Sequence, residues 1–182
     1  FASPVVADNV VYVNTDTSGL RSLSLSTGQP VLNFATGTSW WTSPAIAGKY
    51  VFTVSSEGIV YAVDRSTFKE VWRCNLFGLV TSSPVVSDGV LYIGSRNGSV
   101  YAVDAATGEI LWKFQTGGEI SSSPTLMNGT LVIGSGDRNV YAIDTKTGLL
   151  KWSAATDGPV DSSPTIAGGD VLVGSFDGGL YS

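Results

Sequence analysis

The side chains that most often carry out catalysis are scarce in this sequence. It contains no histidine, the commonest general base and metal ligand in proteins, and a single cysteine, Cys74. One cysteine cannot form an intramolecular disulfide or a multi-cysteine metal site. The simplest interpretation of Cys74 is a small, buried hydrophobic residue in a strand. We therefore expect no catalytic residues, no metal site and no bound cofactor in this chain.

The carboxylates that remain recur at fixed spacing. Asp64, Asp104 and Asp144 lie 40 residues apart, each three residues before a threonine. Asp137 and Asp177 recur with the same interval at a second position. Aspartate side chains accept hydrogen bonds from backbone amides a few residues further on, so both sets are typical of turns. This spacing predicts residues that cap and shape turns, and not ligands for a metal ion.

The composition is that of a globular, acidic chain. Its 182 residues are 43% hydrophobic and 14% charged, which is enough to bury a sizeable core. The net charge of -5 leaves no basic surface to neutralise phosphates, so nucleic acid is not an expected partner. The longest apolar stretches, such as Val10–Val13, are strand-sized and far shorter than the roughly 18 residues that a membrane span needs. We expect a chain that does not span a membrane.

The elements that position these residues follow a strict repeat. Five serine-proline pairs recur every 40 residues, with their prolines at Pro4, Pro44, Pro84, Pro124 and Pro164. The repeat divides the chain into residues 1–41, 42–81, 82–121 and 122–161, with a partial fifth copy at residues 162–182. Such a period predicts one supersecondary unit per copy, stacked on its neighbours.

The third copy shows the strand pattern most clearly. Ser83–Val86, Val90–Gly94, Ser99–Asp104 and Ile110–Gln115 are short and rich in Val, Ile, Tyr and Trp, and turn signals such as Asn-Gly separate them. One four-stranded sheet cannot bury both of its faces alone, so consecutive copies must stack face to face. The sequence therefore predicts an all-β fold, a partial β-propeller with four complete blades and a partial fifth.

Part of each repeat resembles a known motif. Two copies fit the pattern A-x-D-x-x-T-G-x-x-x-W in full, which is similar to the tryptophan-docking motif of the PQQ-like (pyrroloquinoline-quinone-type) β-propeller repeats. The resemblance implies that the tryptophan docks between neighbouring blades beside the Thr-Gly turn, while the aspartate caps that turn. It assigns this structural role to Asp64, Thr67, Trp72, Asp104, Thr107, Gly108, Trp112, Asp144, Thr147, Gly148 and Trp152.

Two copies depart from the motif. The second copy has Phe68 where the glycine belongs. The first copy has Ser22, Ser24 and Leu32 in place of the alanine, the aspartate and the tryptophan. Terminal or interface-forming repeats are often atypical, so the first blade is expected to face a different neighbour from the others.

The family includes the outer-membrane-assembly lipoprotein of Gram-negative bacteria and the quinoprotein dehydrogenases. The resemblance implies a non-catalytic scaffold or a ligand- or protein-binding module. It also implies a part of a larger extracytoplasmic protein (periplasmic, cell-surface or secreted) from a bacterium or archaeon. The alternative is part of a PQQ-dependent dehydrogenase whose cofactor residues lie outside this chain. Such enzymes would have a vicinal disulfide, a calcium ion and a catalytic aspartate near the axis. A third possibility is an extracellular assembly module that self-associates through open blade edges.

Residues that break the repeat are candidates for contact with a partner. Trp41 aligns with Thr81, Ser121 and Asp161, so an aromatic side chain replaces polar ones. Phe77 lies in the connection between two blades, where other copies have glycine or aspartate. Exposed aromatic residues often anchor protein interfaces. Trp41 and Phe77 are therefore the predicted partner-binding residues, with packing against further blades as the alternative.

Overall fold

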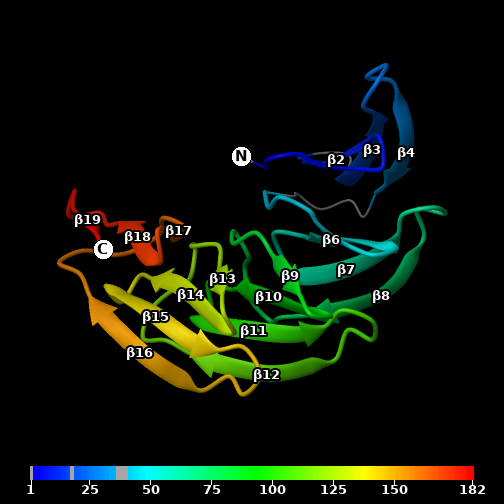
Figure 1. The fold of residues 1–182 in the computed structure, drawn as a ribbon. Helices are drawn as coiled ribbons and strands as arrows, with labels where there is room; N and C mark the ends of the chain where they lie inside the picture. The colour runs from blue at the N-terminus through cyan, green and yellow to red at the C-terminus, as the bar shows by residue number, and fades with distance from the viewer. Residues whose placement is uncertain (1, 17–18, 36–40) are drawn as a thin grey trace.

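The computed structural model describes residues 2–16, 19–35 and 41–182, which form five antiparallel sheets in chain order (Figure 1). The first sheet contains β1 (Val5–Ala7), β2 (Val10–Thr15), β3 (Gly19–Ser24) and β4 (Pro30–Phe34). The second contains β5 (Ala45–Ala47), β6 (Tyr50–Val54), β7 (Ile59–Asp64) and β8 (Glu70–Asn75). The third contains β9 (Val85–Ser87), β10 (Val90–Gly94), β11 (Ser99–Asp104) and β12 (Ile110–Gln115). The fourth contains β13 (Thr125–Met127), β14 (Thr130–Ser135), β15 (Asn139–Asp144) and β16 (Leu150–Ala155). The fifth contains β17 (Thr165–Ala167), β18 (Asp170–Gly174) and β19 (Leu180–Tyr181).

The prediction of an all-β fold is confirmed, because the described residues form strands, turns and bends without a helix. No helix in this part of the chain has the length and hydropathy needed to cross a lipid bilayer. In the third copy the last three strands have the predicted bounds, but β9 is Val85–Ser87 and not Ser83–Val86. The later start has a local cause. Pro84 has no amide hydrogen, and the amide of Ser83 donates to Ser123 Oγ in the next sheet.

The five sheets lie around a common centre, in an arc that is open between the first and the fifth (Figure 1). The first strands of neighbouring sheets contact one another, as β5 does with β9 and β13 with β17. Serines beside these strands join the sheets in series. The amides of Ser43, Ser83 and Ser123 each donate to the hydroxyl of the serine 40 residues further on, at 2.8 to 3.0 Å. This arrangement is a partial β-propeller, and self-association through its blade edges stays a prediction.

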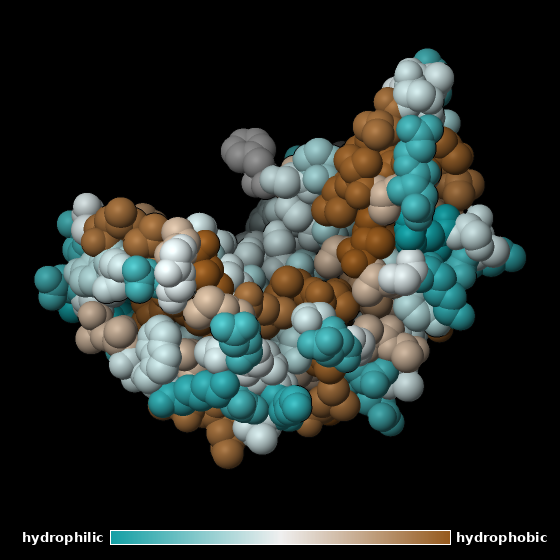
Figure 2. Space-filling model, in the orientation of Figure 1, coloured by the Kyte–Doolittle hydropathy of each residue, from teal (hydrophilic) through white to brown (hydrophobic). Residues whose placement is uncertain are grey.

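The core lies between the sheets. One continuous cluster combines Phe52 and Leu76 from the second blade with Leu91, Ile93 and Tyr101 from the third, all buried. Each face of a sheet carries apolar side chains, so a neighbouring sheet must cover it. Figure 2 shows hydrophobic surface over the first sheet, at one end of the arc.

Each of the first four sheets has a bulge just before the turn between its third and fourth strands. We call this turn the outer turn, and the bulge sets its position. In the third sheet the register between β11 and β12 shifts between Ala102 and Val103. The first, second and fourth sheets shift at the equivalent residues. A bulge adds one residue to one strand and bends it. The turn that follows therefore begins at the same place in each repeat, at Asp64, Asp104 and Asp144 in three of them.

Candidate protein-binding face

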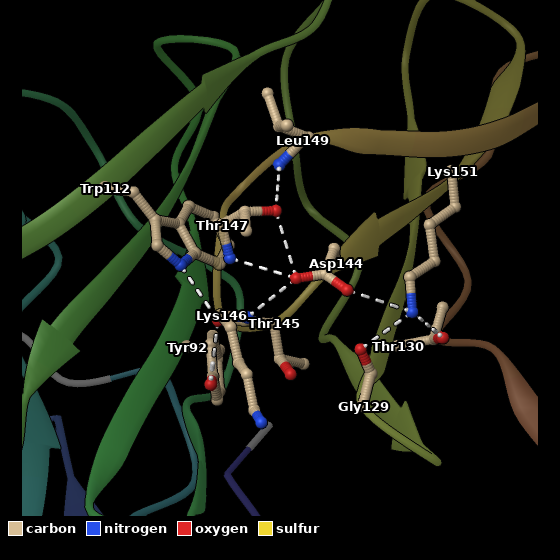
Figure 3. Close-up of polar contacts among 10 residues, drawn as sticks. All are labelled: Tyr92, Trp112, Gly129, Thr130, Asp144, Thr145, Lys146, Thr147, Leu149 and Lys151. Carbon is tan, nitrogen blue, oxygen red and sulfur yellow. Dashed lines mark hydrogen bonds and ion pairs between the residues drawn. The ribbon is translucent and has the colours of Figure 1, made fainter.

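Trp112 in β12 reaches the outer turn of the next sheet (Figure 3). Its Nε1 donates to the carbonyl oxygen of Thr145 at 2.9 Å. Its indole lies against Gly148, where an added Cβ would come within 2.8 Å of the ring. Gly148 also has a φ of +70°, in the left-handed region that favours glycine. The indole therefore occupies the space that a side chain at position 148 would need.

Trp72 makes the same contacts one blade earlier. Its Nε1 donates to the carbonyl oxygen of Ala105 at 3.2 Å, and its indole lies 2.7 Å from the position of a Cβ on Gly108. A buried indole contributes a large apolar area to an interface, provided that its N–H finds an acceptor. At these two interfaces the indole is partly buried and its N–H has an acceptor.

The aspartate at the start of the outer turn holds the turn closed. Asp144 Oδ1 accepts hydrogen bonds from the amides of Lys146 and Thr147 and from the Thr147 hydroxyl, at 3.0 to 3.1 Å (Figure 3). Asp144 Oδ2 lies 3.2 Å from Lys151 Nζ. These contacts favour the charged carboxylate, so the Thr147 amide first, and then Lys151, lower the pKa of Asp144 to about 2.

Asp64 and Asp104 form equivalent turns. The Ser66 hydroxyl, followed by the Thr67 amide, lowers the pKa of Asp64 to about 2. The Thr107 amide is the main cause of the lowered pKa of Asp104. The three motif aspartates therefore act on their own turns in this structure.

The first and second sheets contact each other differently. Phe68 replaces the turn glycine, and its backbone keeps the positive φ, at +55°. Its ring stacks on Tyr12 with 6.3 Å between centroids. In the next two blades the residue equivalent to Tyr12 contacts the tryptophan of its own blade instead, at 5.8 Å. Phe68 thus supplies, from the second blade, the aromatic ring that Leu32 does not provide from the first.

Trp152 is the counterpart of Trp72 and Trp112 in the fourth sheet. It is 42% exposed and lines a cavity of about 110 Å³ together with Val171, Val173 and Tyr181 of the fifth sheet. Its indole is therefore more accessible than those of Trp72 and Trp112.

Asp137, in the hairpin between β14 and β15, accepts a hydrogen bond from the preceding inter-sheet connection. Asp137 Oδ2 accepts hydrogen bonds from the Tyr141 hydroxyl at 2.7 Å and from the Gly117 amide at 2.6 Å. Burial alone would raise the pKa of Asp137, but these bonds and one from Asn139 outweigh it and lower the pKa. Burial and the neighbouring Asp137 raise the pKa of Tyr141 to about 12. Asp177 and Tyr181 repeat the contact at 2.8 Å.

Phe77 lies on the connection between β8 and β9. Its side chain is 79% exposed, and its φ is +56°, a conformation that is uncommon for a bulky residue. Its amide donates to Asn75 Oδ1 at 2.7 Å, and the adjacent Leu76 is fully buried. Leu79, two residues further on, is also exposed. An anchored connection therefore presents two apolar side chains to solvent.

Trp41 lies one blade earlier, in the connection that leads into β5, four residues before the strand begins. It is 50% exposed, whereas the next residue, Thr42, is buried and donates to the carbonyl oxygen of Val54. Trp41 and Phe77 belong to corresponding connections of successive repeats and thus to the same face of the arc. Their role in binding stays a prediction.

This face can be defined by its backbone contacts. The Arg96 amide donates to the carbonyl oxygen of Leu79, the Gly136 amide to that of Glu119, and the Phe176 amide to that of Pro159. The connections that follow β8, β12 and β16 therefore each lie against a hairpin of the next sheet. We call these connections, together with the hairpins between the second and third strands, the loop face. It carries seven of the 15 acidic residues and two of the 10 basic ones, which leaves eight of each sign elsewhere. Its charged residues are Asp16, Glu57, Arg96, Glu119, Asp137, Arg138, Asp157, Asp161 and Asp177. The net negative charge of the chain is therefore concentrated on one face.

Sequence reasoning missed Leu79 and Arg65. Leu79 aligns with Glu119 and Pro159, so a comparison of copies could have found it beside Phe77. Arg65 aligns with Ala105 and Thr145, an equally visible departure from the repeat. The partners of Arg65 lie in another sheet, and the repeat pattern does not name them.

The residues of this chain do not fit a quinone site of the dehydrogenase type. Cys74 has no second cysteine in the sequence, and it is half-buried in β8, where burial raises the pKa of its thiol. Among residues 2–16, 19–35 and 41–182, no group of three or more Cys, Asp or Glu residues is arranged to hold a metal ion. No chemical step through a quinone or a calcium ion is therefore derived for this chain.

The stacked four-stranded sheets, the aspartate-capped turns and the indoles between blades define a β-propeller of PQQ-like repeats. A family model described as "Outer membrane protein assembly factor BamB" matches residues 31–122 and 96–182. The chain belongs to this family. A comparison with curated proteins gives no match.

Solved structures share the fold at low sequence identity. BamB from Moraxella catarrhalis superposes with a TM-score of 0.88 and 20% identity, over 98% of this chain and 59% of that one. The quinohemoprotein alcohol dehydrogenase from Comamonas testosteroni gives a TM-score of 0.81 and 19% identity, over 96% and 39%. The computationally designed Ika8 protein gives 0.67 and 14% identity, over 98% and 69%. The chain thus spans less than two thirds of the length of the BamB structure, and the likeness concerns the fold alone.

Proposed function

We propose that this chain is a non-catalytic scaffold, located outside the cytoplasm, that binds a protein partner through its loop face. The family description, an assembly factor, supports the location and the scaffold role. The observation that carries the binding role is Phe77, which is exposed and held at a positive φ. Propeller folds host many unrelated functions, so the site and not the fold must carry this argument.

Phe77 has two features that folding alone does not favour. A non-glycine residue in the left-handed region costs roughly 1 kcal/mol or more. A phenylalanine with 79% of its surface in water gains little from burial. The equivalent Gly117 avoids both costs, so a second role of Phe77 accounts for its presence. Together with Leu79 it forms an apolar patch suited to the centre of an interface.

Charge indicates the chemistry of the partner. The Phe77 and Leu79 patch is bordered by Glu57 on the adjacent hairpin and by the Arg96 and Glu119 ion pair, with 2.6 Å between Nη2 and Oε2. The surplus of carboxylates on the loop face attracts positive charge. The partner is accordingly a protein with an apolar site surrounded by lysine or arginine residues.

The structural part of the proposal concerns the blades. Trp72 and Trp112 each donate a hydrogen bond to the next blade, which supports a docking role for the motif. We take the blades to have the boundaries expected from the repeat. Such an arc places the inter-sheet connections side by side along the loop face.

Site-specific photo-cross-linking in cells tests the binding role. A photoreactive amino acid at position 77 is compared with one at Leu149, which is also exposed but lies on an outer turn away from the loop face. We expect one discrete protein adduct from position 77 and none of the same mass from position 149. Equal adducts from both positions would reject a specific loop-face interface.

Affinity for the cross-linked partner is then measured with purified proteins. Phe77→Gly is expected to weaken binding by about tenfold or more, as loss of a central aromatic anchor does. The variant relieves the positive φ, so its unfolding midpoint should not fall. Unchanged affinity with unchanged stability would refute the role of Phe77.

A further inference from the structure

An arginine occupies the interface between the first two sheets, on the side of the arc opposite the loop face. Arg65 Nη2 lies 2.6 Å from Asp8 Oδ2, its Nε donates to the Tyr12 hydroxyl at 3.1 Å, and its Nη1 donates to the carbonyl oxygen of Gly48 at 2.9 Å. The guanidinium also lies 5.5 Å from the centre of the Tyr12 ring. A carboxylate, a phenol and a backbone carbonyl thus form a complete guanidinium site within the protein.

The same three acceptors recur between the third and fourth sheets. Two repeats further along, Asp88 replaces Asp8, Tyr92 replaces Tyr12, and the carbonyl of Asn128 replaces that of Gly48. Asp88 has a φ of 51°, against 49° for Asp8, so the two carboxylates leave the backbone in the same conformation. The equivalent of the arginine itself is Thr145, whose short side chain cannot fill the site.

A cavity lies at this position. It has a volume of about 280 Å³ and is lined by Asp88, Tyr92, Asn128 and Thr145, among others. A water molecule takes up roughly 30 Å³ in the liquid, so the cavity has room for a guanidinium group. Tyr92 donates its hydroxyl hydrogen to the carbonyl oxygen of Thr145 at 3.3 Å, and its oxygen keeps lone pairs for an incoming donor (Figure 3).

The interface between the second and third sheets lacks the carboxylate and the phenol. Gly48 stands where the first and third copies have aspartate, and Phe52 stands where they have tyrosine. The residue equivalent to Arg65 there is Ala105, which is buried. Carboxylate and phenol therefore occur together or not at all in the first three copies, and the first copy uses them to bind an arginine.

We infer that the cavity between the third and fourth sheets binds a guanidinium group from outside the chain, in the way that Asp8, Tyr12 and Gly48 bind Arg65. The group is an arginine side chain of another protein or a free guanidino compound. This inference goes beyond the loop-face function, because the cavity lies on the opposite side of the arc and uses other residues. The two can fail independently.

Titration calorimetry at constant ionic strength tests the inference with two ligands, agmatine and acetyl-Gly-Arg-Gly-amide. We expect saturable binding with one site per chain and a dissociation constant on the order of millimolar, as for a partly exposed charged contact. Butylamine, which has one ammonium group and no planar fork, should bind more weakly. Tighter binding of the peptide would assign the site to an arginine of a protein, and equal binding would assign it to the guanidinium group alone.

Substitutions locate the site. Asp88→Asn should weaken binding of agmatine by about tenfold or more, because a charge-assisted hydrogen bond is lost. The backbone tolerates the change, since Asn128 has the equivalent position and a φ of 48°. Asp170→Asn, which removes a carboxylate from β18, is the control with the same change in net charge and should bind as the unaltered protein does.

Adding an arginine at position 145, or removing the one at position 65, gives a second, independent measurement. Thr145→Arg should fill the cavity, abolish agmatine binding and leave the chain folded. Arg65→Thr should create a second site and raise the stoichiometry of agmatine binding from one to two. Agmatine should also stabilise this variant. Absence of saturable binding in the unaltered protein would overturn the inference, as would binding that persists in both Asp88→Asn and Thr145→Arg.

Discussion

At the scale of single residues, one carboxylate organises each outer turn. Asp144 accepts three hydrogen bonds from residues that follow it and contacts Lys151. It therefore satisfies backbone amides that the turn leaves without strand partners. Asp64 and Asp104 do the same in their repeats, which explains why an aspartate recurs at this position in a chain with few charged residues.

The pH dependence of stability follows from these contacts. The pKa of Asp144 is about 2 in the folded protein, below its ordinary value of 3.8. A lowered folded-state pKa contributes stability above the unfolded pKa, and this contribution is lost as the pH falls through the folded pKa. In urea unfolding, Asp144→Asn should be less stable than the unaltered protein at pH 6, and the gap should close between pH 4 and pH 2. A constant gap down to pH 2 would show that the carboxylate charge is not its source.

At the scale of elements, the first three interfaces between sheets each have one large aromatic residue beside the outer turn, but the sheet that supplies it changes. Trp72 and Trp112 lie on a glycine of the following blade. Between the first and second sheets the two sides are exchanged, with Leu32 in place of the tryptophan and Phe68 in place of the glycine. The apolar volume is conserved while its origin moves to the other sheet.

A double-mutant cycle measures this exchange. Phe68→Gly removes the ring on Tyr12 but also relieves a positive φ, so a loss of about 1 to 3 kcal/mol is expected. Leu32→Trp alone should also destabilise, because Phe68 already occupies the space. The double variant should recover stability through a favourable coupling of about 1 to 3 kcal/mol, measured by chemical denaturation. Additive losses would show that an indole at position 32 cannot replace the phenyl ring.

At the scale of the whole molecule, charge is segregated between the two faces. The loop face carries the entire excess of carboxylates, whereas the remaining residues carry eight charges of each sign. Like charges on one face repel one another, and salt screens this repulsion beyond a Debye length of roughly 10 Å at 0.1 M. The excess is therefore a cost to the isolated chain that a positively charged partner would relieve.

Paired neutralisations test this segregation. Glu57→Gln with Asp161→Asn should raise the free energy of unfolding by a few tenths of a kcal/mol at low salt, and by less at high salt. Glu109→Gln with Asp170→Asn changes the net charge equally but away from the loop face, and should bring no such gain. Equal effects of the two pairs would indicate a response to total charge and not to its distribution.

The sequence by itself determined the period, the strand order within a repeat, the turn residues and the partial propeller. It could do so because these features are local: a strand, its hairpin and its capping aspartate lie within about 40 residues and recur. The exposed Phe77 was also visible, since its departure from the repeat is a matter of residue type. These features determined most of the fold and part of the candidate binding face.

Only the tertiary structure decided which departures compensate one another. Arg65 binds Asp8 across 57 residues and two sheets, and Phe68 stacks on Tyr12 in the same interface. Neither pair is local, and the contacts depend on the distance and rotation between sheets, which no periodicity specifies. The cavity beside Asp88 and Tyr92 suggests a guanidinium ligand only when it is compared with the interface between the first two sheets, where Arg65 fills the equivalent position. The physical reason is that stacked blades bring equivalent residues into equivalent positions, and one unlike side chain then decides whether a site is filled.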